Sequence, residues 1–338
     1  MKSYILFYNL WILLALLNVS SCKSQDTVTI SGESRSTYEN PVIKANVPDP
    51  TVIRVGDYFY LYCTEGSILN MPIYQSKNLV DWSLVGTAFD AANRPSSIPG
   101  ARLWAPDIRY INGKYVYYYT MGIWGDLRNS GIGRAISDHP VGPFTDVGKL
   151  FTGAEIGVLN SIDPCIVEDD GKWWLFWGSY WGGIHAIELT EDGLHIKAGA
   201  VKQQVAGDKF EGTYIHKRGQ YYYLFASTGT CCEGTSSTYT TVVGRSENIL
   251  GPYTDSEGRD MLDNNYEIVV HNGDRFVGVG HNAGLVQDKE GNDWLLYHGY
   301  DRQFPINRRL LLDKIEWVND WPQVKNKIAS ETAKAPVL

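Results

Sequence analysis

The chain has 338 residues, which at about 150 residues per domain allows one large domain or two small ones. Its 30 Lys and Arg against 38 Asp and Glu give a formal net charge of −8, which excludes the basic surface that nucleic acids require. The 22 Tyr, 11 Trp and 34 Gly favour aromatic strands joined by tight turns, and therefore an all-β fold.

The N-terminus has the pattern of an export signal. Lys2 precedes an apolar run over residues 4–19, which is too short for a membrane span but typical of a signal-peptide core. The run ends at Val19-Ser20-Ser21-Cys22, which is similar to a bacterial lipobox, whose cysteine is acylated. We expect a signal peptide over residues 1–22 and a linker over residues 23–37. The protein is then exported, either lipid-anchored in a bacterial envelope (periplasmic or at the cell surface) or secreted with an incidental cysteine.

One pattern recurs five times in the rest of the chain: a turn glycine, a polar or aromatic residue, and a dense aromatic strand. The five glycines are Gly56, Gly113, Gly171, Gly219 and Gly291. Each copy has the pattern of the second strand of a hairpin, because dipeptides such as Asn112-Gly113 and Asp170-Gly171 are typical of hairpin turns. The repeat length suits a four-stranded sheet, so we predict one five-bladed β-propeller over residues 38–325, followed by a tail over residues 326–338. An open β-sandwich is the alternative.

A polar residue opens the short strand before each hairpin. The five residues are Asp49, Asp107, Asp163, Glu211 and His281. The first strand of a propeller blade lines the central channel, so we expect these side chains to converge at one mouth of it. Carboxylates gathered without matching lysines indicate metal binding or acid–base chemistry.

Two kinds of chemistry compete for such a cluster. A calcium cage is disfavoured because the chain has no D-x-D-x-D-G loop and histidine is a poor ligand for a hard cation. Glycoside hydrolysis fits because it needs one protonated and one ionised carboxyl group. Glu211 beside an ionised Asp163 is expected to stay protonated near neutral pH, because negative charge nearby raises the pKa of an acid.

Six motifs, taken in order, carry a family resemblance. They lie at residues 46–50, 103–107, 160–164, 211–215, 280–282 and 309–313. Together they closely resemble glycoside hydrolase family 43, whose members are five-bladed propellers that cleave arabinans, xylans and related side chains with inversion. Residues 177–184 and 231–239 look most like the endo-acting α-1,5-L-arabinanases of that family.

The resemblance implies a role for each matched residue. It makes Asp49 the general base, Glu211 the general acid, and Asp163 the carboxylate that tunes the pKa of the acid and orients the substrate. Four further residues are expected to bind substrate: Trp104, Asp107, Asn160 and Ser179. Of these, Asp107 is expected to be structural or to orient substrate rather than to transfer a proton. His281 resembles the channel histidine that lies beside a water-coordinated ion, often calcium, although the chemistry itself needs no cofactor.

The resemblance therefore predicts an inverting endo-α-1,5-L-arabinanase, a monomer whose partner is arabinan or arabino-oligosaccharide. Membrane contact is expected only through a lipid on Cys22. The alternatives are an exo-acting α-L-arabinofuranosidase or β-xylosidase of the same family, a non-catalytic sugar-binding propeller and a protein-interaction propeller. Cys63 and Cys165 are expected to be buried thiols, and Cys231-Cys232 is either a vicinal disulfide or two separate thiols.

Overall fold

The computed structural model describes residues 35–338, which are mostly antiparallel β-strands and the turns between them. The expected signal peptide, Cys22 and most of the expected linker lie outside the described residues. The α-helical content of the described part is one short helix, α1 (Gly153–Ile156). Among residues 35–338, no helix is long and apolar enough to cross a membrane.

Three four-stranded antiparallel sheets follow one another along the chain, each with its strands paired in sequence order. Group 1 contains β2 (Thr51–Val55), β3 (Tyr58–Tyr62), β4 (Pro72–Ser76) and β5 (Ser83–Thr87). Group 2 contains β6 (Arg102–Ile111), β7 (Lys114–Gly122), β8 (Gly131–Ser137) and β9 (Thr145–Thr152). Group 3 contains β10 (Cys165–Asp169), β11 (Lys172–Ser179), β12 (Gly183–Glu188) and β13 (Gln203–Ala206).

A nine-stranded sheet follows, and it divides at the parallel pairing of Thr240 with Val279. Group 4 contains β14 (Glu211–Arg218), β15 (Tyr221–Thr228), β16 (Thr240–Ser246) and β17 (Glu267–Val270). Group 5 contains β18 (Phe276–Gly280), β19 (Val286–Gln287), β20 (Asp293–Asp301), β21 (Phe304–Val318) and β22 (Trp321–Val324).

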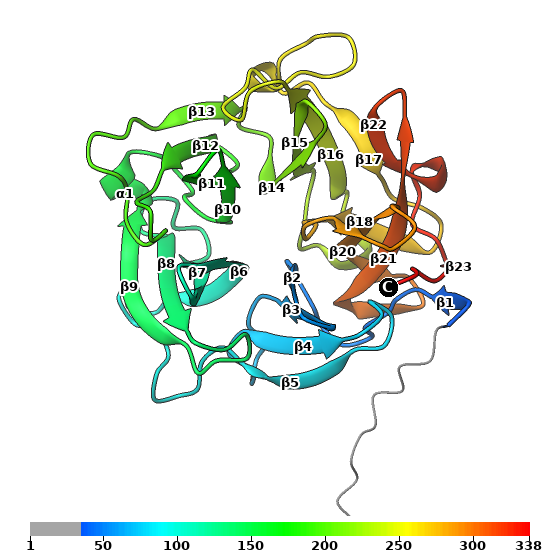
Figure 1. Cartoon of the computed structure of the whole chain (residues 1–338), viewed down its shortest axis with the longest axis horizontal. Coiled ribbons are helices and arrows are strands. Elements are labelled where there is room, and N and C mark those ends of the chain that lie inside the picture. Colours follow the sequence, from blue (N-terminus) through cyan, green and yellow to red (C-terminus); the bar gives the residue numbers. More distant parts are fainter. Residues whose placement is uncertain (1–34) are drawn as a thin grey trace, which may run out of the picture. The chain divides into compact units, whose positions relative to one another are not determined.

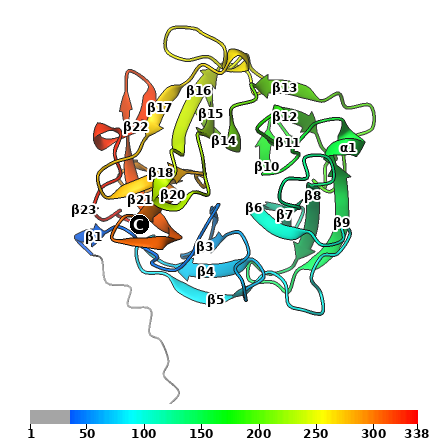
Figure 2. The same ribbon diagram turned by 180° about the vertical axis from the view of Figure 1, so that it is seen from behind.

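The five groups are arranged around a common centre in chain order (Figures 1 and 2). In both views the first strands of groups 1 to 4, which are β2, β6, β10 and β14, lie nearest the centre, and β5 and β9 lie on the outside. The residues that open the first strands therefore lie close to the common centre.

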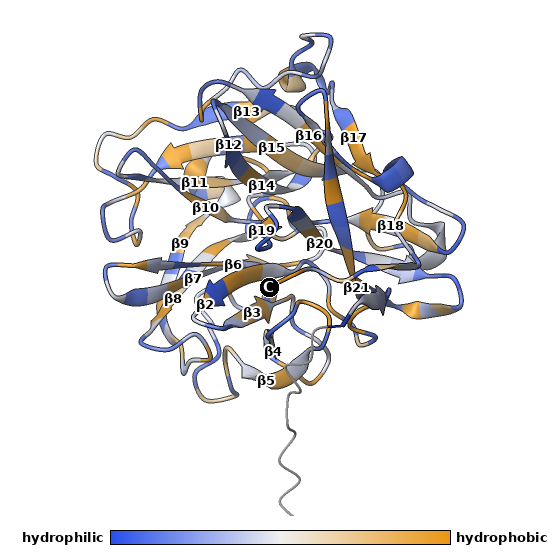
Figure 3. Cartoon of the chain, turned by 45° about the vertical axis from the view of Figure 1, so that its right-hand side comes forward, coloured by the Kyte–Doolittle hydropathy of each residue, from blue (hydrophilic) through white to orange (hydrophobic). Residues whose placement is uncertain are grey.

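Hydrophobic side chains fill each interface between neighbouring groups, as the alternation of side chains along β11 illustrates. Leu175 and Trp177 pack against group 2, whereas Phe176, on the other face of the strand, packs against group 4. Both faces of such a strand are buried, which explains why the repeated strands are aromatic along their whole length instead of alternating with polar residues. Figure 3 shows the same division between hydrophobic strands and more hydrophilic connections.

The last interface joins the two ends of the series. Phe59 and Leu61 of β3 belong to the same core as Leu296 and Leu310 of group 5. The groups thus form a closed ring of five interfaces, an arrangement that supports the predicted five-bladed propeller.

The predicted turn glycines are confirmed. Gly56, Gly113, Gly171, Gly219 and Gly291 have φ between 59° and 82°. Asn112 and Asp170, which precede two of them, also have positive φ (48° and 51°), as the twist of a two-residue hairpin turn requires.

The two ends of the described chain lie together. β1 (Thr37–Glu39) pairs with β23 (Thr332–Lys334), which lies within the expected C-terminal tail. The side chain of Asn40 hydrogen-bonds the backbone of Leu312 in β21 through both its donor and its acceptor, each at 2.9 Å. These contacts attach both ends of the described part, residues 35–338, to group 5.

Candidate active site

One residue with a left-handed backbone conformation lies near the start of the inner hairpin of each group. In groups 2 and 4 it lies within the first strand, at a break in the pairing register. The residues are Asp49 (φ 55°), Ala105 (38°), Asp163 (58°), Gly212 (61°) and His281 (46°). In groups 1 to 4 the residue two positions later pairs in the same register within its hairpin: Thr51 with Tyr62, Asp107 with Tyr118, Cys165 with Phe176, and Tyr214 with Phe225.

This register corrects the sequence alignment of the five strand-opening residues. Asp49, Asp163 and His281 are equivalent, as expected, but Ala105 and Gly212 occupy the matching places in groups 2 and 4. Asp107 lies two residues after the equivalent position in group 2, and Glu211 lies one residue before the equivalent position in group 4. The sequence alone misplaced both because an Asp or Glu near a strand start gives no signal of its exact register.

A side chain from the neighbouring group binds the backbone N–H at each of these five positions. Thr64 accepts from Ala105, Thr120 from Asp163, Ser227 from His281 and the Nδ1 of His298 from Asp49, at 2.7–3.0 Å. These four residues occupy equivalent places on second strands or just after them. At the matching place in group 3 lies Gly178, which has no side chain, and Asp163 itself accepts from the Gly212 N–H at 3.1 Å instead. Left-handed backbone costs about 1–3 kcal/mol at residues other than glycine, and these hydrogen bonds hold it in place.

Asp49 lies at the centre of several favourable contacts. Its Oδ1 is 3.0 Å from Nη1 of Arg308 and 3.4 Å from Nδ1 of both His281 and His298, and its Oδ2 accepts from the Thr64 hydroxyl at 2.5 Å. Burial opposes ionisation of Asp49, but the charge of Arg308, the largest opposing effect, and the hydrogen bond from Thr64 outweigh it and hold the pKa of Asp49 well below its usual range. Asp49 is therefore an ionised carboxylate.

Glu211 and Asp163 lie in a different electrostatic environment. Burial, followed by the charges of Glu211 and Asp49, raises the pKa of Asp163 well above its usual value. Burial is also the main cause that raises the pKa of Glu211, and the charge of Asp49 adds to it. The hydroxyl of Ser179, which donates to Oε2 of Glu211 at 2.7 Å, and that of Tyr239 act in the opposite direction without reversing the shift. The cluster thus combines an ionised Asp49 with two carboxyl groups that retain a proton more readily than free ones.

Asp107 is joined to the protein through both carboxylate oxygens. Oδ1 accepts from the Thr51 hydroxyl at 3.0 Å and from Nη1 of Arg109 at 2.7 Å, and Oδ2 accepts from the Ile166 N–H at 2.6 Å. Its partners belong to groups 1, 2 and 3, and Asp107 is only 3% exposed. These contacts favour the structural role over substrate orientation.

The other expected substrate-binding residues differ in their surroundings. Ser179 is fully buried and contacts Glu211, so its hydroxyl serves the expected acid. Trp104 is half-buried, with its ring 6.3 Å from that of Trp124, which is 79% exposed. Asn160 is half-buried, and its backbone N–H donates to the Leu127 carbonyl at 2.7 Å.

Four residues in contact with the expected catalytic carboxylates were not found from the sequence: Thr64, His298, Arg308 and Tyr239. The repeated pattern of a turn glycine and an aromatic strand contained a signal for two of them. Thr64 and His298 occupy equivalent places, each two residues beyond the matching position in the second strand of its hairpin. Arg308 and Tyr239 left no such signal, because their contacts depend on how groups 4 and 5 pack against the centre.

The side chains around His281 decide whether the expected ion can bind there directly. The Nδ1 atom of His281 faces two carboxylates: it lies 3.4 Å from Oδ1 of Asp49 and 4.0 Å from Oδ2 of Asp163. Within residues 35–338, no group of three or more His, Cys, Asp or Glu side chains is arranged to hold a metal directly. The described residues therefore do not fit a metal bound directly by several protein side chains, and a water-mediated calcium ion stays a prediction.

The cysteines divide into two kinds. Cys63 and Cys165 are buried thiols, as expected. Cys231 and Cys232 are joined in a disulfide, one of the two alternatives that the sequence left open. The disulfide lies in the connection between Gly229, whose carbonyl accepts from Tyr180 at 2.6 Å, and Tyr239, which contacts Glu211.

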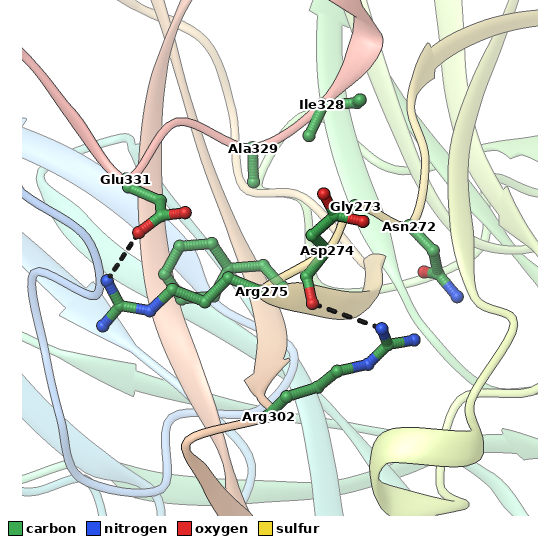
Figure 4. Close-up of a pocket in the computed structure, with 9 residues that line it drawn as sticks. Asn272, Gly273, Asp274, Arg275, Arg302, Ile328, Ala329 and Glu331 are labelled. Carbon is green, nitrogen blue, oxygen red and sulfur yellow. Dashed lines mark hydrogen bonds and ion pairs between the residues drawn. The ribbon is translucent and has the colours of Figure 1, made fainter.

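A separate cavity of about 430 Å³ lies beside group 5 (Figure 4). Three of its four charged side chains are bound within the protein: Arg275 pairs with Glu331 at 3.2 Å, and Arg302 donates to the Asp274 carbonyl at 3.2 Å. None of the expected catalytic residues lines it. We therefore place the candidate site at the carboxylate cluster instead.

Comparisons with known proteins point to glycoside hydrolysis, the chemistry that suits the carboxylate cluster. The chain is 34% identical to the extracellular exo-α-(1→5)-L-arabinofuranosidase ArbA of Cellvibrio japonicus, over 84% of this chain and 88% of the relative. It is 31% identical to the extracellular endo-α-(1→5)-L-arabinanase 1 of Bacillus subtilis, over 81% and 86%. A solved α-L-arabinanase of Cellvibrio cellulosa, in complex with arabinohexaose, matches with a TM-score of 0.75 and 31% identity, over 83% of this chain and 96% of that one.

The structural neighbours are family 43 arabinanases, which are five-bladed propellers. The model of the glycosyl hydrolases family 43 matches residues 38–322, almost all of the described chain. The carboxylate cluster and these matches lead to one conclusion: the chain belongs to glycosyl hydrolases family 43.

Proposed function

We propose that this protein is a five-bladed β-propeller that hydrolyses internal α-1,5-L-arabinofuranosidic bonds of arabinan, with inversion, at one mouth of its channel. One observation carries the proposal: in a single buried cluster, Asp49 is held ionised while burial and negative charge favour the protonated form of Glu211. Inverting hydrolysis needs this pair of opposite protonation states. The similarity to arabinanases supplies the substrate class.

The mechanism assigns one proton transfer to each carboxyl group. Glu211 gives its proton to the leaving glycosidic oxygen, and Asp49 takes a proton from the water that attacks the opposite face of the sugar. Arg308 and Thr64 keep Asp49 ionised and oriented. The two carboxyl groups are expected to lie about 6.5–9.5 Å apart, which leaves room for the water.

Asp163 is proposed to act on Glu211. Two buried carboxyl groups that interact do not both ionise easily, so the pair retains one proton near neutral pH. We assign that proton to Glu211, since the proposed mechanism needs a protonated acid at that residue. The Gly212 N–H, which donates to Oδ2 of Asp163, supports the ionised form of Asp163, whereas the Ser179 and Tyr239 hydroxyls act on Glu211 in the same sense and oppose the assignment.

Aromatic side chains offer surfaces for the neutral substrate. Trp104 is half-buried and its neighbour Trp124 is largely exposed, so a sugar ring can pack its apolar face against this pair. Asn160, on the connection that follows α1, is proposed to hydrogen-bond a sugar hydroxyl.

The exo-acting alternative is carried by one observation, the 34% identity to an exo-α-(1→5)-L-arabinofuranosidase. The experiment is hydrolysis of debranched linear arabinan, branched arabinan, arabinoxylan and xylan, with the products sized over time. A ladder of oligomers from linear arabinan at early times supports internal cleavage, whereas monomer or a single short product from the outset supports the exo-acting alternative. Release only from xylan or arabinoxylan contradicts both.

Glu211→Gln and Asp49→Asn are the test variants, because each preserves the shape of the side chain and removes the proton chemistry. Both are expected to lose activity by at least about 1,000-fold. Asp138→Asn is the matched control: it changes an exposed carboxylate that pairs with Lys114 and is expected to leave activity unchanged.

Export is proposed as well, because both curated relatives named above are described as extracellular. We propose that Cys22 carries a lipid that anchors the mature protein in the cell envelope. Fractionation of cells that express the full chain tests this: wild type is expected in the membrane fraction and Cys22→Ala outside it. Wild type in the soluble fraction contradicts the anchor.

A further inference from the structure

Two buried aromatic rings, those of Tyr239 and His298, face each other between groups 4 and 5. Their centroids are 5.7 Å apart and their planes are within 16° of parallel. Tyr239 is 1% exposed and His298 is fully buried. Gly280 makes room for the stack, because a Cβ at that position would lie only 2.3 Å from the Tyr239 ring.

Each ring contacts one of the two carboxylic residues to which catalysis is assigned. The Nδ1 of His298 accepts the backbone N–H of Asp49 at 3.0 Å, and the hydroxyl of Tyr239 hydrogen-bonds Glu211. Burial, reinforced by the charge of Glu211, raises the pKa of Tyr239 well above its usual value, so the hydroxyl keeps its proton and donates. Burial and Arg308 lower the pKa of His298, so its ring is neutral and Nδ1 is free to accept.

We propose that Tyr239 and His298 form one positioning unit, a stacked pair that fixes the carboxyl group of Glu211 relative to that of Asp49. The proposal rests on the proposed function. Each ring has only two side-chain torsions and both are packed on all sides, so the unit restrains the acid and the base more tightly than two separate loops can. Such restraint affects catalysis, because a displacement of a catalytic group by about 1 Å can reduce the reaction rate about 100-fold.

The unit also affects the proton affinity of the acid. The charged or titratable groups that act on or near Glu211 are Asp49, Asp163, Arg308, Tyr180 and Tyr239. Tyr239→Phe leaves the first four and the stack in place and removes one donor to the carboxylate. Since a hydrogen bond to a carboxylate stabilises the ionised form, its loss is expected to raise the pKa of Glu211.

The first experiment compares the pH profiles of kcat and KM for Tyr239→Phe, wild type and Tyr253→Phe on linear arabinan. Tyr253, in the connection between β16 and β17, is the control, because it is a fully buried tyrosine whose hydroxyl donates to the Ile249 carbonyl at 2.6 Å. Tyr239→Phe is expected to lower kcat about tenfold, to change KM less than about twofold, and to move the alkaline limb to higher pH. An unchanged limb, or the same change in Tyr253→Phe, overturns the proposal.

The second experiment is a double-mutant cycle with His298→Asn, whose side-chain oxygen can still accept from Asp49 but which lacks the ring. If the pair acts as one unit, the double variant is expected to lose no more kcat than the worse single variant. Losses that multiply show two independent residues and overturn the proposal. Thermal unfolding of each variant identifies any that fails to fold, and Tyr239→Phe then decides the question by itself.

A third measurement separates this proposal from the proposed function. Carbon-13 NMR titration of the Glu211 carboxyl group, assigned with Glu211→Gln, needs no substrate. A pKa higher in Tyr239→Phe than in wild type supports the unit even if arabinan is not cleaved, and an equal pKa overturns it even if arabinan is cleaved. Wild type that cleaves no arabinan contradicts only the proposed function.

Discussion

The guanidinium of Arg308 lies 3.0 Å from the carboxylate of Asp49, although the two residues are 259 positions apart in the sequence. The backbone reinforces this contact, since the Val47 N–H donates to the Arg308 carbonyl at 2.8 Å and the Arg308 N–H to the Asn46 side chain at 3.1 Å. The contact therefore joins group 5 to the residues that lead into group 1. It connects closure of the ring with the ionisation of the expected base.

Arg308→Met is expected to shift the acidic limb of the pH profile. It removes the largest favourable charge on Asp49, so the pKa of Asp49 rises and activity is lost at a higher pH on acidification. The pH dependence of kcat/KM on linear arabinan between pH 3 and 7 measures this. Lys114→Met, which breaks the exposed pair with Asp138, is the control. An acidic limb that does not move would show that Asp49 does not control it.

Asp163→Asn is expected to shift the alkaline limb of the pH profile. Removing a carboxylate that interacts with Glu211 lowers the pKa of Glu211, so the acid loses its proton, and the enzyme its activity, at a lower pH. The direction is opposite to that expected for Tyr239→Phe, so the two variants check each other on the same alkaline limb. A shift to higher pH in Asp163→Asn contradicts the role assigned to Asp163.

Asp107→Ala is expected to act on stability. It leaves the half-buried Arg109 without its partner and removes contacts to Thr51 and Ile166, at a cost of about 3–5 kcal/mol of unfolding free energy. Urea unfolding measures the loss, with Asp138→Asn as the control. The fraction that remains folded is expected to keep a kcat within a few-fold of wild type. A stable variant with a large fall in kcat assigns Asp107 to the chemistry instead.

Asp313 makes the stability of the fold depend on pH. Burial raises its pKa from 3.8 to about 7, against hydrogen bonds from Ser330 and Tyr297 that lower it. The folded state then holds a proton that the unfolded state has lost, so this group destabilises the fold as pH rises from about 4 to 7, by up to about 4 kcal/mol.

Asp313→Asn removes that pH dependence. Unfolding free energies from pH 4 to 8 are expected to decline less steeply in the variant than in wild type. The variant is also expected to be the more stable of the two at pH 8. Parallel curves for the two proteins contradict the assignment.

Local patterns predicted the repeating part of this molecule. The turn glycines and the aromatic strands after them recur because each blade needs a hairpin buried on both faces, and that need is visible in any single copy. Asp49 and Asp163 could be found for the same reason, since each precedes a strand of the repeat.

The parts that the sequence did not reveal depend on packing between groups. The misplacement of Asp107 and Glu211 is a matter of register, which only the paired strands define. Arg308 and Tyr239 reach the centre through the closure of the ring and the stack on His298, and neither contact has a local signature.

The most direct test of the account is the anomeric configuration of the first product released from linear arabinan by the wild-type protein, followed by proton NMR. Attack of a water activated by Asp49, with Glu211 protonating the leaving oxygen, predicts that the new reducing end appears first as the β-anomer, from the α-linked substrate. The α-anomer appearing first would contradict the inverting mechanism. Absence of hydrolysis by the folded protein would contradict the proposed activity itself.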